Sequence, residues 1–452
     1  MSLINISSQI SDQPNARLVA RSLASVWHPC TQMKQHADFP LIPIQSGDGV
    51  WLTDMAGKRY LDGVSSWWVN LFGHANPRIN AALVAQLNSL EHVMLAGCTH
   101  EPAVELAERL AGLTGLGHAF YASDGASAVE IALKMSFHYW RNVGQPFKQK
   151  FVALSNSYHG ETLGALAVTD VALFRDVYHG LLNNNIITPA PVPSVHQLDD
   201  NFPCCIACAE EAAQVLEQLL MQRHHEIAAL IVEPLVQGAA GMRMYHPHYL
   251  VRARQLCTAY NVHLIADEIM TGFGRTGTMF AWTQSHAPRP DFICLSKGIT
   301  GGYLPLSCVL TTDTVYAAFY DDATARGFLH SHSYTGSALA CRAALATLDI
   351  FESDNVIALN AKNAPLFNQY CLPLREHPRV KNFRHLGMIW AFELETRRTA
   401  FAQYFFAEAV ARGLLLRPIG YTVYFMPPYV IDAETFKWMV DQTLAILDNI
   451  NE

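Results

Sequence analysis

One lysine of this sequence stands in a setting that suits a chemical role better than a surface role. In DFICLSKGITGGYLP, residues 291–305, Lys297 follows an apolar run and precedes a loop rich in glycine. An unperturbed lysine has a pKa of ~10.4, and desolvation lowers that pKa and makes the amine nucleophilic toward a carbonyl. Lys297 is therefore a candidate Schiff-base lysine, although most lysines that follow a strand are ordinary surface residues.

A carboxylate that could accompany such an amine is Asp267, which ends the apolar run HLIAD. Burying a carboxylate is costly unless a cation pairs with it, and a protonated pyridine nitrogen is such a cation. A lysine and an aspartate in these roles are the arrangement that surrounds pyridoxal phosphate (PLP). Taken alone, Asp267 could equally cap the helix that follows it.

Two further stretches could hold the other parts of such a cofactor. In SDGASAVE, residues 123–130, Gly125 and Ala126 open a helical pattern without bulky side chains, and backbone N–H groups at a helix N-terminus bind phosphate. In SNSYHGET, residues 155–162, Tyr158 could stack on a cofactor ring. Any capped helix can start like the first stretch, and the second could equally be a turn with a half-buried tyrosine.

These residues need a scaffold that brings them together, and the pattern of apolar runs indicates one. Short, nearly continuous apolar runs such as IAALIVEP and VHLIADE alternate with stretches of helical spacing. That alternation is typical of an α/β fold with a mainly parallel sheet covered by helices on both faces. Ligands of such folds bind at the carboxyl ends of the strands, and positions 124, 158, 267 and 297 all lie at or just after predicted strand ends.

The two ends of the chain differ from this middle part. The C-terminal residues contain a helical pattern in SALACRAALATLDIFES, a strand-like IWAFELE and a final helix from AETFKWMVDQTLAILDNI. We interpret them as a smaller α+β lobe to which both termini contribute. The predicted division is 1–75 as the N-terminal segment of the small lobe, 76–340 as the large domain and 341–452 as the C-terminal small domain.

Composition narrows the class of protein. The chain has 452 residues, is 50% hydrophobic and 15% charged, and carries a formal net charge of −8, which argues against nucleic acid or an anionic membrane as a partner. We recognise neither a signal peptide nor a membrane-spanning run, and cysteines scattered through apolar runs suit a cytoplasmic location. Cys204, Cys205 and Cys208 do not complete a set of four metal ligands with His196, so we predict no metal.

The order of the four candidate features resembles that of the class III aminotransferases, most clearly in LIADEIMTGFGRTGTMFA followed by DFICLSKGITGGYLP. The resemblance implies a fold-type I PLP-dependent transferase whose large domain has a mainly parallel, seven-stranded sheet. It implies that Lys297 holds PLP and shuttles a proton, and that Asp267 keeps the pyridine nitrogen protonated. Tyr158 would lie over the ring, and Gly125 and Ala126 would bind the phosphate.

Other stretches are similar to one branch of that family. They are VWHPCTQM, LDGVSSWWVNLFGHANP, EHVMLAGCTH, EPLVQGAAGMRMYHP and LLRPIGYTVYFMPPY. This branch acts in biotin synthesis, where it moves an amino group from S-adenosylmethionine to 8-amino-7-oxononanoate and gives 7,8-diaminononanoate, by a ping-pong mechanism through pyridoxamine phosphate. The resemblance therefore implies that activity, with these two small molecules as substrates.

The resemblance assigns substrate contacts to residues from both halves of the chain. Arg417 would pair with the substrate carboxylate, and Trp67 would wall the pocket against the methylene chain. A long-chain carboxylate needs an apolar slot closed by a cation, although Trp67 and its neighbour Trp68 could be core and Arg417 an ordinary ion pair. The full set implied for substrate is Trp67, Tyr158, Lys297, Ser331, Arg417, Tyr424, Cys30 and Glu161.

The resemblance also implies an active homodimer whose active sites lie at the subunit interface. His332 and Ser333, in HSHSYTGSALAC, would reach the PLP phosphate of the neighbouring subunit. Ser331, just before them, would offer a backbone contact.

Some positions depart from the pattern of the branch and keep alternatives open. Cys30 stands where a tyrosine is usual in the substrate pocket, so lysine is a rival amino donor for the same acceptor. Other departures are Ala126 for serine, Glu161 for aspartate, Ser331 for glycine and Ser333 for threonine. Another class III ω-aminotransferase, acting on ornithine, 4-aminobutyrate or β-alanine, and an aminomutase are further alternatives. A binding protein without activity is disfavoured because Lys297 and Asp267 are both present.

Overall fold

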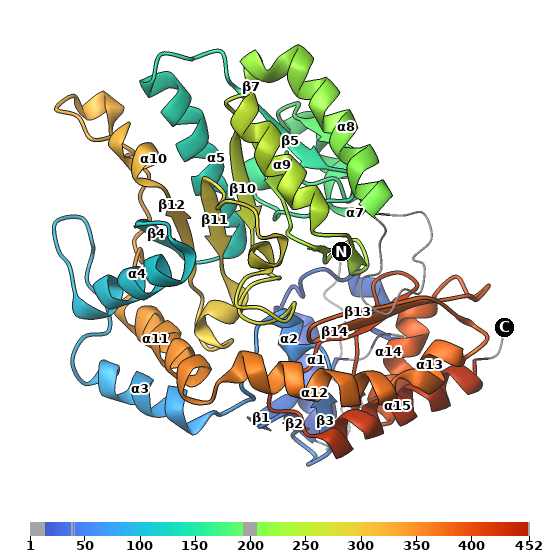
Figure 1. Ribbon diagram of the computed structural model, residues 1–452. Coiled ribbons are helices and arrows are strands. Elements are labelled where there is room, and N and C mark those ends of the chain that lie inside the picture. The colour runs from blue at the N-terminus through green and yellow to red at the C-terminus, as the bar shows by residue number, and fades with distance from the viewer. Residues whose placement is uncertain (1–13, 38, 40, 193–205, 451–452) are drawn as a thin grey trace, which may run out of the picture.

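A mainly parallel sheet forms the centre of the computed structural model, which describes residues 14–37, 39, 41–192 and 206–450 (Figure 1). Its seven strands lie in the order β4-β12-β11-β10-β7-β5-β6. β12 is antiparallel to both β11 and β4, and the other pairs are parallel. The strands are β4 (His118–Ala122), β5 (Lys150–Leu154), β6 (Ile186–Thr188), β7 (Ile227–Val232), β10 (His263–Asp267), β11 (Phe292–Leu295) and β12 (Ser307–Thr311).

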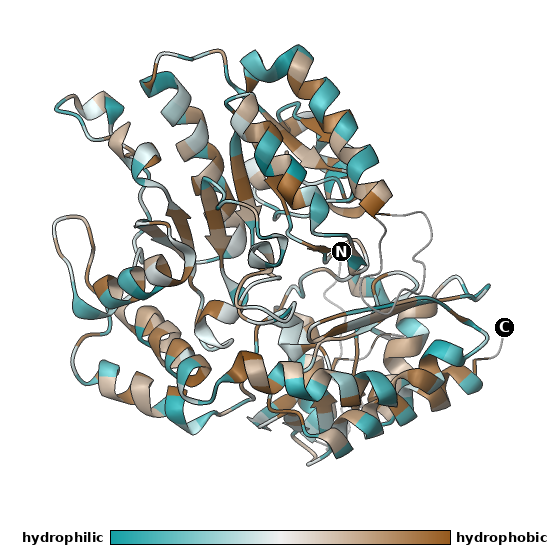
Figure 2. Ribbon diagram, viewed as in Figure 1, coloured by the Kyte–Doolittle hydropathy of each residue, from teal (hydrophilic) through white to brown (hydrophobic). Residues whose placement is uncertain are grey.

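Successive residues of these strands pack against helices on opposite faces of the sheet. In β10, Leu264 and Ala266 belong to the larger buried cluster, which includes residues of α8 (Ile206–Arg223) and α9 (His248–Ala259). Ile265, between them, belongs to a second cluster built on α5 (Gly125–Asn142). Every residue of β10 is buried, which is why the strand reads as a nearly continuous apolar run. Figure 2 shows the strands in brown between helices with teal outer surfaces.

The remaining elements of this part of the fold surround the sheet. The helix α11 (Ala338–Ser353) packs against α3 (Pro77–Leu87) and α4 (Glu101–Thr114), and α4 also contacts β4. The shorter elements are α6 (Leu163–Leu166), α7 (Ala172–Arg175), α10 (Asp313–Ala317) and the hairpin of β8 (Val236–Gln237) and β9 (Arg243–Met244). The 3-10 helices are η1 (Met33–Ala37), η2 (Asp176–Leu181), η3 (His224–Glu226), η4 (Ala281–Ser285), η5 (Lys297–Thr300) and η6 (Thr324–Arg326).

A smaller lobe joins the N-terminal and C-terminal parts of the chain. Its four-stranded sheet has the order β1-β2-β3-β15, and β15 (Leu414–Leu415) pairs in parallel with β3 (Arg59–Asp62). A three-stranded sheet has the order β13-β14-β16. The other elements are β1 (Ile44–Asp48), β2 (Trp51–Asp54), β13 (Val380–Leu386), β14 (Ile389–Leu394), β16 (Thr422–Phe425), α1 (Pro14–Ser25), α2 (Ser65–Trp68), α12 (Val356–Tyr370), α13 (Leu372–Glu376), α14 (Phe401–Ala411) and α15 (Ala433–Asp448).

The expected α/β architecture, with a mainly parallel seven-stranded sheet covered by helices, is confirmed. The division into 1–75, 76–340 and 341–452 stays a prediction, and its second boundary falls inside α11. Within the described ranges, no helix is long and apolar enough to cross a membrane. Cys204, Cys205 and His196 lie outside the described residues, and those ranges contain no group of three or more potential metal ligands.

Candidate active site

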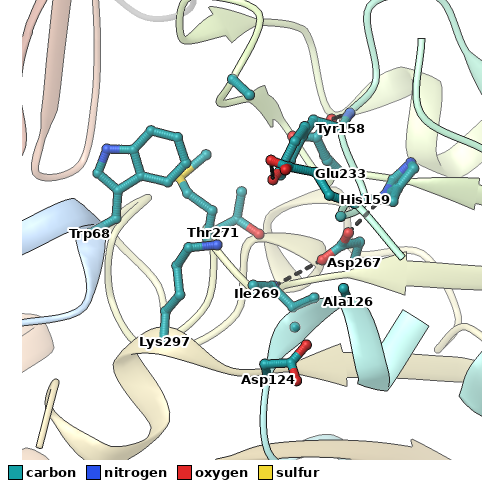
Figure 3. A pocket seen from close by; sticks show the side chains of 15 residues that line it. Trp68, Asp124, Ala126, Tyr158, His159, Glu233, Asp267, Ile269, Thr271 and Lys297 are labelled. Carbon is teal, nitrogen blue, oxygen red and sulfur yellow. Dashed lines mark hydrogen bonds and ion pairs between the residues drawn. The ribbon is translucent and has the colours of Figure 1, made fainter. Parts of the chain in front are cut away.

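The carboxyl ends of four strands meet at a cavity of about 290 Å³. α5 begins just after β4, the loop 155–162 follows β5, Asp267 ends β10 and Lys297 follows β11. The cavity is lined by residues of all four segments, together with Trp68 from the small lobe. Figure 3 shows Lys297 and Asp267 extending into this space from neighbouring strands. The sheet therefore gathers the residues that the sequence places at separate strand ends.

Lys297 occupies a tight junction between β11 and the glycine loop. Its backbone has a φ of +47°, and it opens the 3-10 helix η5. Its Nζ lies 5.5 Å from the centroid of the Trp68 ring. Desolvation lowers the pKa of Lys297, and the opposing effects of Asp267 and Glu233 are smaller. A larger share of this amine is therefore neutral, and nucleophilic, than of a surface lysine at the same pH.

Asp267 is a buried carboxylate held in place from two sides. His159 Nδ1 donates to Asp267 Oδ2 over 2.7 Å, and the backbone N–H of Ile269 donates to Oδ1 over 3.1 Å. The carboxylate is 4% exposed, and His159 Nε2 has no hydrogen-bond partner among the described residues. An anion in this position favours a cationic partner in the cavity, and a protonated ring nitrogen meets that requirement.

The start of α5 forms a close-packed cradle with the loop after β5. Asp124 caps the helix, because its Oδ1 accepts from the backbone N–H of Ser127 over 2.9 Å. A Cβ at Gly160 would lie 2.5 Å from the Cβ of Ala126, and a Cβ at Gly125 would lie 3.0 Å from Ile269. Only glycines allow this approach, and it leaves a helix N-terminus open to the cavity. With Lys297 and Asp267, the cradle fits a phosphorylated pyridine aldehyde.

Tyr158 and two glutamates border the same cavity. Tyr158 Oη donates to Glu161 Oε1 over 2.8 Å, and the Tyr158 backbone N–H donates to Glu233 Oε2 over 2.9 Å. Burial, followed by Glu161, raises the pKa of the Tyr158 phenol well above its usual value, and Cys30 adds to that effect. Burial raises the pKa of Glu233 to about 7, and the charge of Asp267 acts in the same direction.

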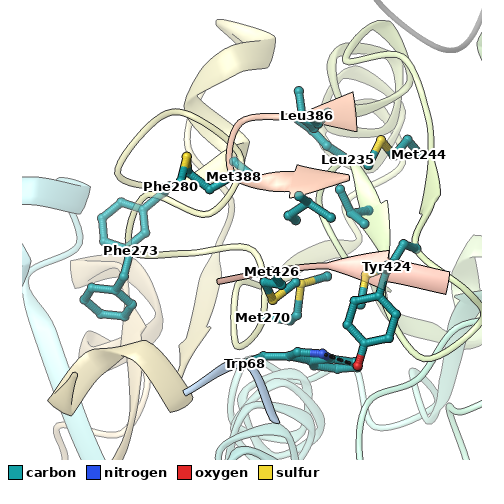
Figure 4. Packing of buried hydrophobic residues seen from close by; sticks show 14 of the residues in the cluster. Trp68, Leu235, Met244, Met270, Phe273, Phe280, Leu386, Met388, Tyr424 and Met426 are labelled. Carbon is teal, nitrogen blue, oxygen red and sulfur yellow. Dashed lines mark hydrogen bonds between the residues drawn. The ribbon is translucent and has the colours of Figure 1, made fainter. Parts of the chain in front are cut away.

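A second group of predicted residues lies beyond Trp68. Trp68 Nε1 donates to Tyr424 Oη over 3.0 Å (Figure 4). The guanidinium of Arg417 lies 5.1 Å from the centroid of the Trp67 ring and donates to the carbonyl of Cys30 over 3.0 Å. Trp68 is 6% exposed and Trp67 45% exposed, so only the first is a core residue. The group therefore combines aromatic side chains with the guanidinium of Arg417, on the side of Trp68 away from the strand ends.

The two tryptophans lie on a left-handed turn. The φ angles from Ser65 to Trp68 are all positive, between +47° and +74°. Each non-glycine residue in this conformation costs about 1–2 kcal/mol, and such residues usually occur singly. Contacts from the surrounding structure must therefore hold the turn.

The remaining predicted residues lie outside this chain's own cavity. Ser331 and Ser333 are exposed, while His332 is half-buried and its Nε2 lies 3.1 Å from Ser123 Oγ. The carbonyl of Ser333 accepts from His92 Nε2 over 2.8 Å. Their predicted role in a neighbouring subunit stays a prediction.

Two residues of the cavity were missed from the sequence, namely His159 as the partner of Asp267 and Glu233. Glu233 follows the apolar run IAALIV, so the reasoning applied to Asp267 would have found it. His159 had no comparable signal, because its pairing depends on the packing of two separate loops.

Comparisons with known proteins bear on this site. A family model described as aminotransferase class III matches residues 32–447. The adenosylmethionine-8-amino-7-oxononanoate aminotransferase of Helicobacter pylori is 48% identical over 444 residues, which cover 96% of this chain and 98% of that protein. The crystal structure of the enzyme of the same name from Methanocaldococcus jannaschii has a TM-score of 0.89 at 33% identity and covers 96% of this chain and 99% of that one. A PLP-bound amine transaminase from an uncultivated Pseudomonas species has a TM-score of 0.87 at 31% identity, covering 94% and 98%.

Proposed function

The chain belongs to the class III aminotransferase family, and we propose that it transfers an amino group from S-adenosylmethionine to 8-amino-7-oxononanoate, giving 7,8-diaminononanoate for biotin synthesis. One observation carries the choice of acceptor. Trp68 lies beside the amine of Lys297, and the adjacent Trp67 lies beside the guanidinium of Arg417. An amino-ketone acceptor with a distant carboxylate needs an amine at its reacting end and a cation at its carboxylate end, with an apolar wall between them.

PLP is the cofactor of this family's chemistry, and when bound it supplies an aldehyde carbon that exchanges amines and a ring that takes up electrons. The residues proposed to hold it share one property, which is that they border the cavity at the strand ends. They are Lys297, Asp267, Tyr158, Gly125 and Ala126.

Asp267 has the task of keeping a ring nitrogen protonated. Its ionised form accepts hydrogen bonds from His159 and from the backbone of Ile269. Both hydrogen bonds hold the carboxylate of Asp267 at the cavity, where it can accept a hydrogen bond from a protonated ring nitrogen. His159 thereby acts on the cofactor through Asp267.

Lys297 has the task of moving a proton. Its lowered pKa leaves Nζ free to accept the proton that leaves the amino-bearing carbon of the donor. The same Nζ then gives a proton to the reacting carbon of the acceptor. The ring of Trp68, close to Nζ, keeps water from that side of the amine.

Arg417 binds the carboxylate of the acceptor. Its guanidinium is partly exposed and donates one hydrogen bond, to the carbonyl of Cys30, within the described part of the chain, so donor groups remain for a charge-assisted contact. Trp67 and the Trp68–Tyr424 pair contact the methylene chain between the two ends.

Tyr158 and Glu161 lie at the amino-ketone end of the acceptor, where the amino donor also reacts. The carboxylate of Glu161 accepts from the Tyr158 phenol and offers a negative charge to a cationic donor. S-adenosylmethionine and lysine both carry such a cation, and the Cys30 thiol provides no phenol to choose between them. Lysine as donor to the same acceptor therefore stays the second candidate.

We also propose a cytoplasmic homodimer in which His332 and Ser333 contact the PLP phosphate of the other subunit and Ser331 offers a backbone contact. Support comes from large side chains beside these residues that face solvent, namely Leu329 at 74% and Tyr334 at 64% exposure. A subunit interface would bury such side chains. The described cysteines form no disulfides, which suits a reducing compartment.

A donor half-reaction tests the proposed function. The protein is loaded with PLP, and S-adenosylmethionine, lysine, ornithine or 4-aminobutyrate is added separately while the visible absorbance of the cofactor is followed. Conversion by S-adenosylmethionine, reversed by 8-amino-7-oxononanoate, is the expected result. Conversion by lysine alone would move the assignment to the second candidate. If neither S-adenosylmethionine nor lysine converts the cofactor, both candidate functions are wrong.

Lys297→Ala tests the assignment of the reactive amine. This variant is expected to lose both the cofactor absorbance and turnover. Lys437→Ala is the matched control, because Lys437 lies on the exposed face of α15 and pairs with Asp441 on the same helix. Wild-type absorbance and turnover in Lys297→Ala would refute the site.

A further inference from the structure

The left-handed turn Ser65–Trp68 connects the two ends of the pocket. Its third residue, Trp67, contacts the guanidinium of Arg417, and its fourth, Trp68, lies beside the amine of Lys297. Because the two tryptophans are adjacent in the chain, a change in the turn moves both walls together. The shape of the turn therefore sets the space between the reacting end and the carboxylate-binding end.

The turn has no glycine to relieve its positive φ angles, and a buried carboxylate holds it instead. Asp62, at the end of β3, is 0% exposed. Its Oδ1 accepts from the backbone N–H of Ser66 over 2.9 Å, and its Oδ2 accepts from Ser66 Oγ over 2.7 Å. Both bonds go to a residue with φ +47° and ψ +52°, which lies inside the turn. Asp62 thus fixes the strained backbone directly.

Asp62 is in turn oriented by His74. The Nε2 of His74 donates to Asp62 Oδ2 over 3.0 Å, and Asn70 Nδ2 donates to His74 Nδ1 over 3.2 Å. The backbone of His74 is fixed as well, since it exchanges two hydrogen bonds with Gly49. Both ring nitrogens of His74 are thereby engaged, and Nε2 faces the carboxylate of Asp62.

Asp62 ends β3, and Arg417 follows β15, the strand paired with β3. Asp62 pairs with Leu415 across the β3–β15 ladder, and Arg417 follows Leu415 by two residues. A second clamp comes from Ser65, whose Oγ donates to the carbonyl of Met426 over 2.7 Å just after β16. The turn and Arg417 therefore share one rigid base in the small lobe.

We propose that Asp62 and His74 are positioning residues that set which chain length of carboxylate the acceptor pocket takes. Neither needs to touch the substrate, since both act through the backbone of the turn that carries Trp67 and Trp68. The inference rests on the proposed function, because it takes the space between Lys297 and Arg417 as the acceptor pocket.

The test uses the PLP-loaded enzyme and a series of straight-chain monocarboxylates from shorter to longer than nonanoate. Binding is followed by the change in cofactor absorbance and tryptophan fluorescence, so it needs no turnover. The variant His74→Phe removes the donor to Asp62, and Asp62→Asn places an amide N–H against the N–H of His74. Both are expected to weaken the best-bound carboxylate about tenfold or more and to flatten the chain-length preference.

Two further variants separate positioning from stability. His74→Gln keeps an N–H donor near the position of Nε2 and is expected to restore the preference. Asp54→Asn is the matched control, because Asp54 is also a buried carboxylate of the small lobe, 2% exposed, and accepts from Tyr60 Oη over 2.9 Å away from the pocket. It is expected to lower the unfolding temperature without changing carboxylate binding.

The outcomes distinguish the two claims. If His74→Phe and Asp62→Asn keep the chain-length preference of the wild type, or if Asp54→Asn flattens it equally, the positioning role is overturned while the proposed function stands. If the wild-type enzyme binds none of the carboxylates, the acceptor pocket itself is wrong, and the proposed function falls first.

Discussion

Gly160→Ala is the sharpest test of how the cofactor cradle is built. Gly160 has a φ of +124°, a conformation that residues with a side chain rarely adopt. The added Cβ would lie 2.5 Å from the Cβ and 2.9 Å from the Cα of Ala126, and 3.3 Å from the Cβ of Ala165. The nearest atoms belong to the first turn of α5, which cannot swing aside like the end of a flexible side chain. The loop and the helix must therefore move apart.

The expected loss follows from two separate costs. The positive φ contributes about 1–3 kcal/mol for a residue with a Cβ. Overpacking against the backbone of α5 contributes about 1–3 kcal/mol more. The variant should therefore lose about 2–6 kcal/mol of unfolding free energy. If the overpacking displaces the helix N-terminus, the dissociation constant for PLP should rise by roughly tenfold or more, since about 1.4 kcal/mol corresponds to tenfold.

Gly144→Ala is the control for the backbone cost alone. Gly144 has a φ of +79°, follows α5 at its other end, and has no atom within 4 Å of the added Cβ. It should lose only about 1–2 kcal/mol and keep wild-type affinity for PLP. Urea unfolding of both variants gives the free energies, and titration of the apoprotein with PLP gives the affinities. If Gly160→Ala loses no more stability than the control and binds PLP as tightly as the wild type, the proposed cradle is wrong.

Three further predictions concern other parts of the molecule. Arg417→Met should raise the KM for the acceptor roughly tenfold or more, and Arg417→Lys should restore the KM only in part, because an ammonium cannot form a bidentate contact. Steady-state kinetics of each variant measures this KM. An unchanged KM would exclude Arg417 as the carboxylate partner. In the apoprotein, Lys297 should react with an amine-directed reagent at lower pH than Lys437, because desolvation lowers the pKa of Lys297. Mass spectrometry of labelled peptides across a pH series measures the labelling of each lysine. Equal labelling profiles for the two lysines would contradict the prediction. Burial lowers the pKa of His263 from 6.5 to about 4, so the unfolded chain binds more protons than the folded chain between these pH values, and stability should fall as the pH falls through them. In urea unfolding, His263→Phe should lose less unfolding free energy than the wild type over that range. An equally steep loss of stability would show that other groups cause the pH dependence.

The sequence predicts most of what lies at the strand ends. Lys297 and Asp267 each follow a buried apolar run, and burial of a charged residue at such a place is itself a signal. The same reasoning extends to Glu233. These residues are predictable because a parallel sheet brings all its carboxyl ends to one edge, whatever the loops between them do.

The contacts at the other end of the pocket are less predictable. SSWW contains no glycine or asparagine, so its composition gives no reason to expect four positive φ angles. The turn is held by Asp62, which His74 orients, and the pairing of the segments that carry these two residues depends on the small-lobe sheet. The helices α3 and α4 were also not expected, because their buried faces are completed by α11, which lies more than two hundred residues further along the chain.

The pairing of β3 with β15 affects how the protein is made. Lys58, just before β3, bonds to the carbonyl of Val410, 352 residues further along the chain. On the ribosome, the strands that carry Asp267 and Lys297 emerge well before β15, so the large sheet can begin to fold while β3 still waits for its neighbour. An unpaired strand edge invites pairing with other chains. The nascent protein therefore carries an aggregation-prone edge until β15 is synthesised, and a truncation that removed Leu414 and Leu415 would leave that edge open permanently.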